Sequence, residues 1–248
     1  MNDIIYIYGT HALTEALTHM PEAVREVLIA PEANAMKIRE LARQHKIPVG
    51  VFSEKAMPRE FDRGAVHQGV VGGVIRARLM RPYKDFIRDL KITPDTALVL
   101  LGEVEDPQNV GAVIRSAGAF GVAGVLIPEH NQAQVGGAVV KVSAGMAFRI
   151  PLVSIGNVNT VVRDLKERGF WIFGLDGSAK ESIADEKFDA PTVLLLGNEA
   201  DGIRAKTREL CDKLLSIPMN PQCESLNASA SAAVALYAWS TKHPKVFQ

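Results

Sequence analysis

Residues Leu98 to Pro128 read LVLLGEVEDPQNVGAVIRSAGAFGVAGVLIP. It begins and ends with a short apolar run. Between the two runs, four apolar residues recur at the spacing of one helix face: Val110, Val113, Ile114 and Ala117. Short runs that are apolar throughout are typical of parallel strands covered on both faces. The stretch therefore predicts a strand, a helix and a second strand of a parallel α/β sheet.

The same alternation continues through the second half of the chain. Strands are expected at 97–101, 124–127, 171–175, 192–196 and 213–217. Helices are expected at 110–120, 135–144, 157–168, 206–210 and 225–240. Residues 95–248 are therefore predicted to form one α/β domain on a parallel sheet.

The first part of the chain predicts a smaller α/β domain over residues 1–75. Its first helix carries a stripe of apolar side chains: Ala12, Leu13, Ala16 and Leu17. Residues 76–94 then form a predicted linker with basic side chains: Arg76, Arg78, Arg81, Lys84, Arg88 and Lys91. Such a strip can be a solvated connector or can face RNA phosphates, and composition alone favours the connector.

The composition excludes several classes of protein. The chain has 248 residues and a formal net charge of zero, so nucleic-acid binding would need a local basic patch. Cys211 and Cys223 are the only cysteines, and their spacing fits neither a disulfide framework nor a zinc site. No apolar run is long enough to span a membrane, and the opening MNDIIYIYGTHAL does not read as a signal peptide. A cytoplasmic protein without a metal is expected.

Ligands of open parallel sheets collect at the carboxyl ends of the strands, and three loops at such ends carry unusual residues. In the first, GEVEDPQNVGAVIR, either Asp106 or Asn109 can cap the following helix. Arg115 lies off the apolar stripe of that helix, so it faces water or a ligand. Taken singly, a cap and a surface charge explain Asn109 and Arg115.

The second and third loops follow later strands. LLLGNEADGIRAKT brings Gly197 and Glu199 directly after a buried strand, where glycine lets the backbone approach a ligand closely. LLSIPMNPQCESLNASASAAVALYAW holds Ser225 and Asn227 before a helix of small residues, and Ser225 can be its N-cap. Motifs for dinucleotides, nucleoside triphosphates, zinc and serine hydrolases do not occur in the sequence.

Together the three loops resemble the three signature motifs of the SpoU-type RNA ribose 2′-O-methyltransferases, which belong to the SPOUT superfamily. The matching stretches are DPQNVGAVIRSAGAFG, LLLGNEADGI and SIPMNPQCESLNASASAAVAL, in the same order as in the family. The first domain resembles the small RNA-binding domain that precedes the catalytic domain in two-domain members, on IYGTHALTEAL and GAVHQGVVG. In this combination the chain resembles the members that methylate a guanosine of large-subunit rRNA.

The resemblance implies a fold and a cofactor that composition alone could not indicate. It implies a trefoil knot near the C-terminus, a homodimer through the catalytic domains, and S-adenosylmethionine held by backbone at Gly197, Ile217 and Leu226. The motif match gives catalytic roles to a set of residues: Asn109, Arg115, Glu199, Ser225 and Asn227.

Two aspects of the implied chemistry stay open. Arg115 could act as the base for the ribose hydroxyl, or it could hold a phosphate while water takes the proton, because a guanidinium normally stays protonated. The third motif departs from the family pattern at Asn220 and Pro221, and Pro221 changes the loop where a glycine is common. The alternatives to an rRNA enzyme are a tRNA ribose methyltransferase and a non-catalytic RNA-binding or ribosome-assembly protein. The target nucleotide cannot be read from the sequence.

Overall fold

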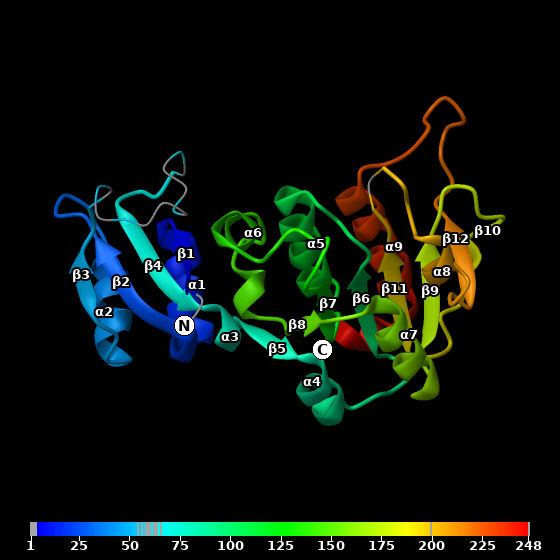
Figure 1. Ribbon diagram of the computed structural model, residues 1–248, viewed down its shortest axis with the longest axis horizontal. Helices are drawn as coiled ribbons and strands as arrows, with labels where there is room; N and C mark the ends of the chain where they lie inside the picture. The colour runs from blue at the N-terminus through cyan, green and yellow to red at the C-terminus, as the bar shows by residue number, and fades with distance from the viewer. Residues whose placement is uncertain are drawn as a thin grey trace. The chain divides into compact units, whose positions relative to one another are not determined.

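The computed structural model describes residues 4–53, 55, 57, 61, 64, 66–198 and 200–247 (Figure 1). It divides into two compact units. The first unit consists of residues 1–80 and 135–149, and the second unit consists of residues 81–134 and 150–248. The predicted domain limits, 1–75, 76–94 and 95–248, remain a prediction beside this division by contacts.

The first unit is built on a four-stranded sheet in the order β1-β4-β2-β3. β4 is antiparallel to β1 and β2, whereas β2 and β3 are parallel. Its elements are β1 (Ile4–Tyr8), α1 (Thr10–His19), η1 (Pro21–Ala23), β2 (Val24–Ile29), α2 (Met36–Gln44), β3 (Val49–Val51), β4 (Val70–Ile75), α3 (Arg76–Leu79), α6 (Gly137–Val142) and η3 (Met146–Phe148). The predicted stripe of α1 is confirmed, because all four of its residues are buried.

The segment at 135–149 belongs to the first unit because two glycines allow it to approach closely. A Cβ on Gly137 would lie 2.4 Å from the backbone oxygen of Tyr6, and one on Gly145 would lie 2.4 Å from Glu15 Cγ. Arg149 Nε donates to Glu15 Oε2 over 2.6 Å, and this bond holds the pKa of the Glu15 carboxyl below its usual value. The helix expected at 135–144 is therefore shorter, as α6, and packs in the first unit.

The second unit is built on an eight-stranded sheet in the order β10-β12-β9-β11-β6-β7-β8-β5. All pairings from β10 through β8 are parallel, so the predicted α/β fold with a parallel sheet is confirmed. The elements are β5 (Met80–Pro82), α4 (Tyr83–Asp89), β6 (Ala97–Leu101), α5 (Pro107–Ala119), β7 (Gly124–Pro128), β8 (Leu152–Ile155), α7 (Val158–Glu167), β9 (Trp171–Leu175), β10 (Glu181–Ser182), η4 (Ile183–Asp185), β11 (Thr192–Leu196), α8 (Ala205–Arg208), β12 (Lys213–Ser216), α9 (Ala228–Lys242) and η5 (Pro244–Phe247).

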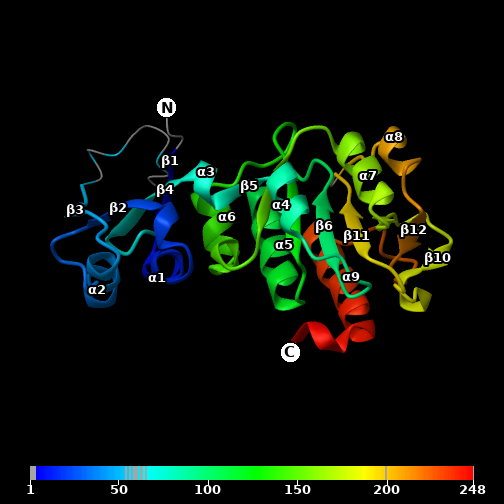
Figure 2. The same cartoon turned by 90° about the horizontal axis from the view of Figure 1, so that it is seen from below.

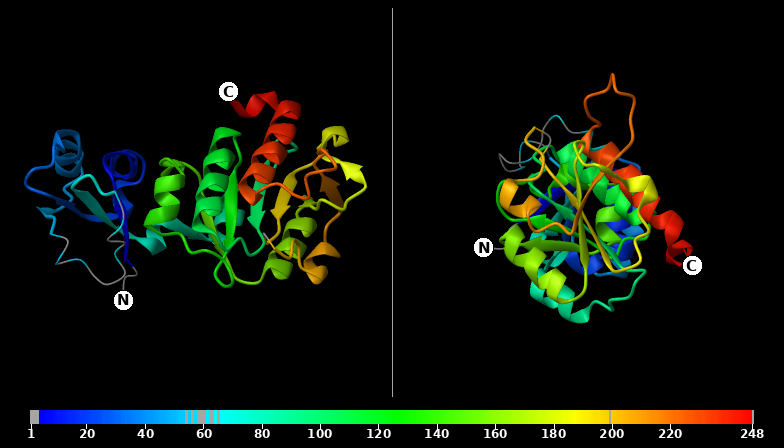
Figure 3. Two further views of the ribbon diagram at one scale, coloured as in Figure 1. Left: turned by 90° about the horizontal axis from the view of Figure 1, so that it is seen from above. Right: turned by 90° about the vertical axis from the view of Figure 1, so that its right-hand side faces the viewer.

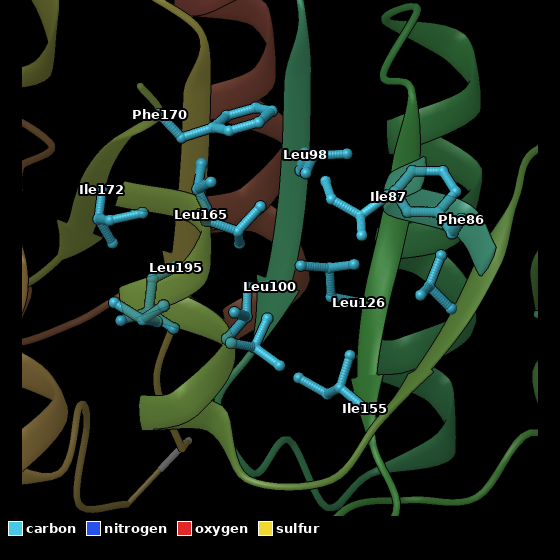
Figure 4. Close-up of a cluster of buried hydrophobic side chains, with 14 residues drawn as sticks. Phe86, Ile87, Leu98, Leu100, Leu126, Ile155, Leu165, Phe170, Ile172 and Leu195 are labelled. Atoms are coloured by element: carbon cyan, nitrogen blue, oxygen red, sulfur yellow. The ribbon is translucent and has the colours of Figure 1, made fainter. Parts of the chain in front are cut away.

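Helices cover both faces of this sheet. α4 and α7 lie on one face, and α5 and α9 lie on the other (Figure 2 and Figure 3). Figure 4 shows the apolar cluster under α4 and α7, in which Phe86, Leu165 and Phe170 pack against strand residues such as Leu98 and Leu195. The central strands are buried on both faces, which explains why β6 and β11 contain only apolar residues apart from Thr192.

Two expectations for the second unit are wrong in detail. β8 was not expected from the sequence, because it is only four residues long and follows Pro151, and because Ser154 interrupts its run of apolar residues. The helix expected at 225–240 begins at Ala228, because Asn227 and not Ser225 is its N-cap. The side-chain oxygen of Asn227 accepts from the backbone nitrogens of Ser229 (2.9 Å) and Ala230 (3.3 Å).

The basic linker is folded, and part of its charge is paired. α3, β5 and α4 occupy most of it. Arg81 lies 2.9 Å from Asp89, and Arg88 lies 3.0 Å from both Asp85 and Asp89. Because Asp85 and Asp89 neutralise Arg81 and Arg88, the linker presents less charge to a phosphate than its composition suggests. This pairing favours the connector over the phosphate-facing strip.

Candidate active site

The carboxyl ends of β6 and β11 are joined by direct backbone contact. Gly102 N donates to the backbone oxygen of Leu196 over 2.6 Å, and a Cβ on Gly102 would lie 2.6 Å from the same oxygen. Only glycine therefore fits at this position. The contact brings the loop after β6 against the loop after β11, so the first two sequence motifs meet in space.

The loop after β11 folds back on itself through Asn198 and Gly202. Asn198 N donates to Gly202 O over 2.9 Å, and Gly202 N returns a bond to Asn198 O over 3.0 Å. A Cβ on Gly197 would lie 2.3 Å from the carbonyl carbon of Gly202, so Gly197 lets the two sides of the loop approach. The sequence prediction named Gly197 but missed Asn198.

Asn198 also fixes the loop after β6. Its side-chain nitrogen donates to the backbone oxygen of Glu103 over 2.8 Å, while its side-chain oxygen accepts from Ala200 N over 2.8 Å. The backbone φ of Glu103 is 69°, a value that residues other than glycine rarely adopt. Asparagine often forms a turn in which its side-chain oxygen accepts from the backbone two residues further on, and an asparagine just after a buried strand was the signal for Asn198 in the sequence.

α5 and α9 bring the first and third motifs together. Asp106, and not Asn109, caps α5, because its carboxylate accepts from Gln108 N over 2.8 Å. Asn109 is therefore left to another role, and its buried side-chain oxygen accepts from the side-chain nitrogen of Asn227 over 2.9 Å. This bond joins residues that are 118 positions apart in the chain.

A cavity of about 410 Å³ lies at the carboxyl ends of β9, β11 and β12. Its walls include the three residues expected to hold a cofactor, Gly197, Ile217 and Leu226. Ser225 and Asn227 also line it. The sequence motifs after β11 and β12 thus line a single cavity, and the Asn109–Asn227 bond connects it to α5.

Among the described residues that line this cavity, Asp176 and Glu224 carry charged side chains. Burial acts to raise the pKa of the Asp176 carboxyl, but hydrogen bonds from the hydroxyl and the backbone of Ser178, together with Arg208, outweigh it and lower that pKa. Arg208 lies 2.6 Å from Asp176. Glu224 is exposed and has no ion-pair partner within the described part of the chain. Because Arg208 offsets the charge of Asp176, Glu224 supplies the uncompensated negative charge among the described residues of the wall.

Arg115 does not line this cavity. Arg115 lies exposed on α5 and forms no ion pair with any residue that the structure describes. Glu199 lies outside the described residues. In the described ranges, no group of three or more His, Cys, Asp or Glu could hold a metal ion. No helix in the described ranges is both long enough and apolar enough to cross a membrane.

Comparison with known proteins connects this geometry to one family. Residues 96–237 match the SpoU rRNA Methylase family, and residues 6–79 match the family described as RNA 2'-O ribose methyltransferase substrate binding. Among curated proteins, the chain is 39% identical over 237 residues to the 23S rRNA (guanosine-2'-O-)-methyltransferase RlmB of Xanthomonas axonopodis pv. citri, with 94% of each chain covered. It is 34% identical over 235 residues to RlmB of Haemophilus influenzae, covering 93% of this chain and 95% of the relative.

A solved structure shows the same likeness. The SpoU methyltransferase AviRb from Streptomyces viridochromogenes, in complex with the cofactor AdoMet, is 27% identical and superposes with a TM-score of 0.82. The comparison covers 97% of this chain and 91% of AviRb. The resemblance read from the three sequence motifs is confirmed, and the chain belongs to the SpoU rRNA methylase family.

Proposed function

We propose that this chain transfers a methyl group from S-adenosylmethionine to the ribose 2′-OH of a guanosine in large-subunit rRNA. The observation that carries the proposal is the bond between Asn109 and Asn227 at the edge of the cavity beside Gly197. It joins the first and third motifs, which a family member needs in one place. The curated relatives, named as 23S rRNA guanosine-2′-O-methyltransferases over nearly their whole length, support the substrate.

The cavity fits S-adenosylmethionine in size, shape and charge. About 410 Å³ lies within the range of small-molecule sites. Gly197 lines the cavity with its backbone, because the backbone of Gly202 and Ile203 fills the space where a side chain would lie. The carboxylate of Glu224 in the wall suits a ligand with a positive sulfonium and a positive ammonium group. Gly197, Ile217 and Leu226 would hold the cofactor, which supplies an electrophilic methyl group when bound.

The protein groups then have to position the ribose hydroxyl and manage its proton. Asn109 and Asn227 fix each other, so the beginnings of α5 and α9 form a rigid support beside the cavity. Ser225, in the cavity wall, offers a hydroxyl to the substrate. Arg115 either accepts the proton or holds an adjacent phosphate through its planar fork, and Glu199 belongs to the same set through its motif.

The same proposal includes the protein's assembly and surroundings. We propose that the protein forms a homodimer through the second unit and that its C-terminal segment forms a trefoil knot. We also propose that the protein is located in the cytoplasm. Exposed apolar side chains on α9, Val234 at 39% and Tyr237 at 60% exposure, support the dimer. The ring centroids of Tyr237 and of Phe120, at the end of α5, lie 6.1 Å apart. The apolar surface therefore continues from α9 to the end of α5.

A transfer assay tests the proposal. Purified protein, S-adenosylmethionine with a labelled methyl group, and 23S rRNA that lacks ribose methylation should give labelled RNA. The yield should be the same with and without a chelator, because no step needs a metal. The same rRNA carrying a 2′-O-methyl group on every guanosine serves as the control. Label on that premethylated rRNA, or a requirement for metal, would contradict the proposal.

A further inference from the structure

A second cavity of about 470 Å³ lies beside the cofactor cavity and has no assigned role. It lies at the carboxyl ends of β6, β7, β8 and β11, where open parallel sheets bind ligands. Seven residues give it its polar character: Glu103, His130, Asn131, Asn157, Asn159, Arg204 and Thr207. The bond from Asn198 to the backbone of Glu103 separates the two cavities, since Asn198 lines the first and Glu103 the second.

The amide groups of Asn157 and Asn159 have fixed orientations. The side-chain oxygen of Asn157 caps α7 and accepts from Thr160 N over 3.0 Å. The side-chain oxygen of Asn159 accepts from the Thr207 hydroxyl over 2.7 Å, and Thr207 is buried. Because both oxygens are occupied inside the protein, each amide offers its nitrogen to a ligand. Within the described ranges, neither side-chain nitrogen has a hydrogen-bond acceptor.

Arg204 adds further donors to the cavity. Arg204 uses its Nε to bond the Glu103 carboxylate over 2.6 Å, which leaves the rest of its guanidinium without an acceptor in the part of the chain that is described. The same ion pair engages one oxygen of the Glu103 carboxylate and offsets its charge. His130 and Asn131 are exposed at the cavity, and each can donate or accept. The cavity is therefore rich in donors and close to neutral.

A donor-rich, nearly neutral cavity distinguishes between bases. Asparagine reads adenine by accepting from N6 with its oxygen while donating to N7 with its nitrogen, and here the oxygen is already used. Guanine presents two acceptors, O6 and N7, on the same edge, and arginine is the usual partner of that edge. We propose that this cavity binds a guanine base of the RNA substrate through donors from Asn157, Asn159 and Arg204. This inference rests on the proposed function only in taking RNA as the ligand.

Titration of the full-length protein with 5′-GMP, 5′-AMP and inorganic phosphate tests the proposal, followed by NMR of backbone amides. GMP should shift the resonances of residues around 156–160 and 203–207 at a concentration about tenfold lower than AMP, since one lost base contact costs about a factor of ten or more. Equal shifts by phosphate alone would show a phosphate site and overturn the proposal. Equal affinity for AMP would overturn it as well.

Two substitutions remove the donors without removing the internal bonds. Asn159→Asp keeps an oxygen for Thr207, and Asn157→Asp keeps a cap for α7, because aspartate caps helices as well as asparagine does. In each variant the ratio of GMP to AMP affinity should fall about tenfold or more, because a carboxylate repels O6 and N7 and accepts from the adenine amino group. The ratio cancels any repulsion of the phosphate, which both nucleotides carry. Asn34→Asp, exposed in the first unit, adds the same charge elsewhere and should leave the ratio unchanged.

The outcomes separate this inference from the proposed function. Affinity for S-adenosylmethionine, measured by calorimetry, should be unchanged in Asn159→Asp. An unchanged GMP to AMP ratio in both variants would overturn the guanine site while leaving methyl transfer possible. Absence of methyl transfer to rRNA by the unaltered protein, together with a normal GMP preference, would instead count against the proposed function alone.

Discussion

Replacing Arg115 with alanine should lower the rate of methyl transfer to RNA by a factor on the order of 10² to 10⁴, the usual contribution of a positioned proton-transfer group. Affinity for S-adenosylmethionine should hardly change. Arg115 lies exposed on α5 and lines no part of the cofactor cavity, so its loss leaves that cavity intact. Single-turnover kinetics and calorimetry on the same preparation measure the two quantities separately.

Two further variants give the Arg115 result its meaning. Arg163→Ala removes an exposed arginine from α7, on the other face of the sheet, and should leave the rate unchanged. Arg115→Lys keeps the charge but loses the planar fork, so recovery of most of the rate would favour simple attraction over two-point binding of a phosphate. If Arg115→Ala turns over as fast as the unaltered protein, Arg115 is only a surface charge.

Replacing Gly197 with alanine should weaken binding of S-adenosylmethionine by about a hundredfold or more. The added Cβ would lie 2.3 Å from Gly202 C and 2.5 Å from Ile203 N, both backbone atoms that cannot move aside like a flexible side chain. The loop after β11 would have to open, and this loop is a wall of the cofactor cavity. A misplacement of about 1 Å in a binding loop is enough for a change of this size.

Gly156→Ala is the matched control for Gly197→Ala. Gly156 does not line the cofactor cavity, and a Cβ there would meet no atom within 4 Å. It should therefore bind the cofactor with nearly unchanged affinity. Calorimetry measures the affinity of both variants for S-adenosylmethionine, and circular dichroism shows whether each variant is folded. Equal affinity of folded Gly197→Ala and unaltered protein would mean that the loop after β11 does not hold the cofactor.

The parallel sheet could be predicted because its central strands have a clear apolar pattern in the sequence. β6 and β11 are apolar along almost their whole length, and helical stripes such as that of α5 separate the strands. β8 could not be predicted in the same way, because four residues next to a proline carry too little pattern. The placement of 135–149 in the first unit was also beyond the sequence, since it depends on the close approach at Gly137 and Gly145.

The candidate site was predictable in its parts and not in its connections. The sequence named Asn109 and Asn227, but left open whether Asn109 was only a cap. The structure gives that task to Asp106 and joins Asn109 to Asn227 instead. Asn198 was missed because an asparagine in a turn has an ordinary explanation, and only the distance to Glu103 reveals its second bond. The fixed amides of Asn157 and Asn159 likewise depend on partners, one of which is 48 positions away.

Mapping of ribose methylation in cellular RNA is the direct test of whether this chain methylates a guanosine of 23S rRNA. Total RNA from cells with and without this gene is digested and analysed by mass spectrometry, nucleotide by nucleotide, and a strain with the gene restored serves as the control. We expect one guanosine in 23S rRNA to lose its 2′-O-methyl group when the gene is deleted and to regain it when the gene is restored. A complete 23S pattern in the deletion strain, with the loss found in tRNA or nowhere, would contradict the account.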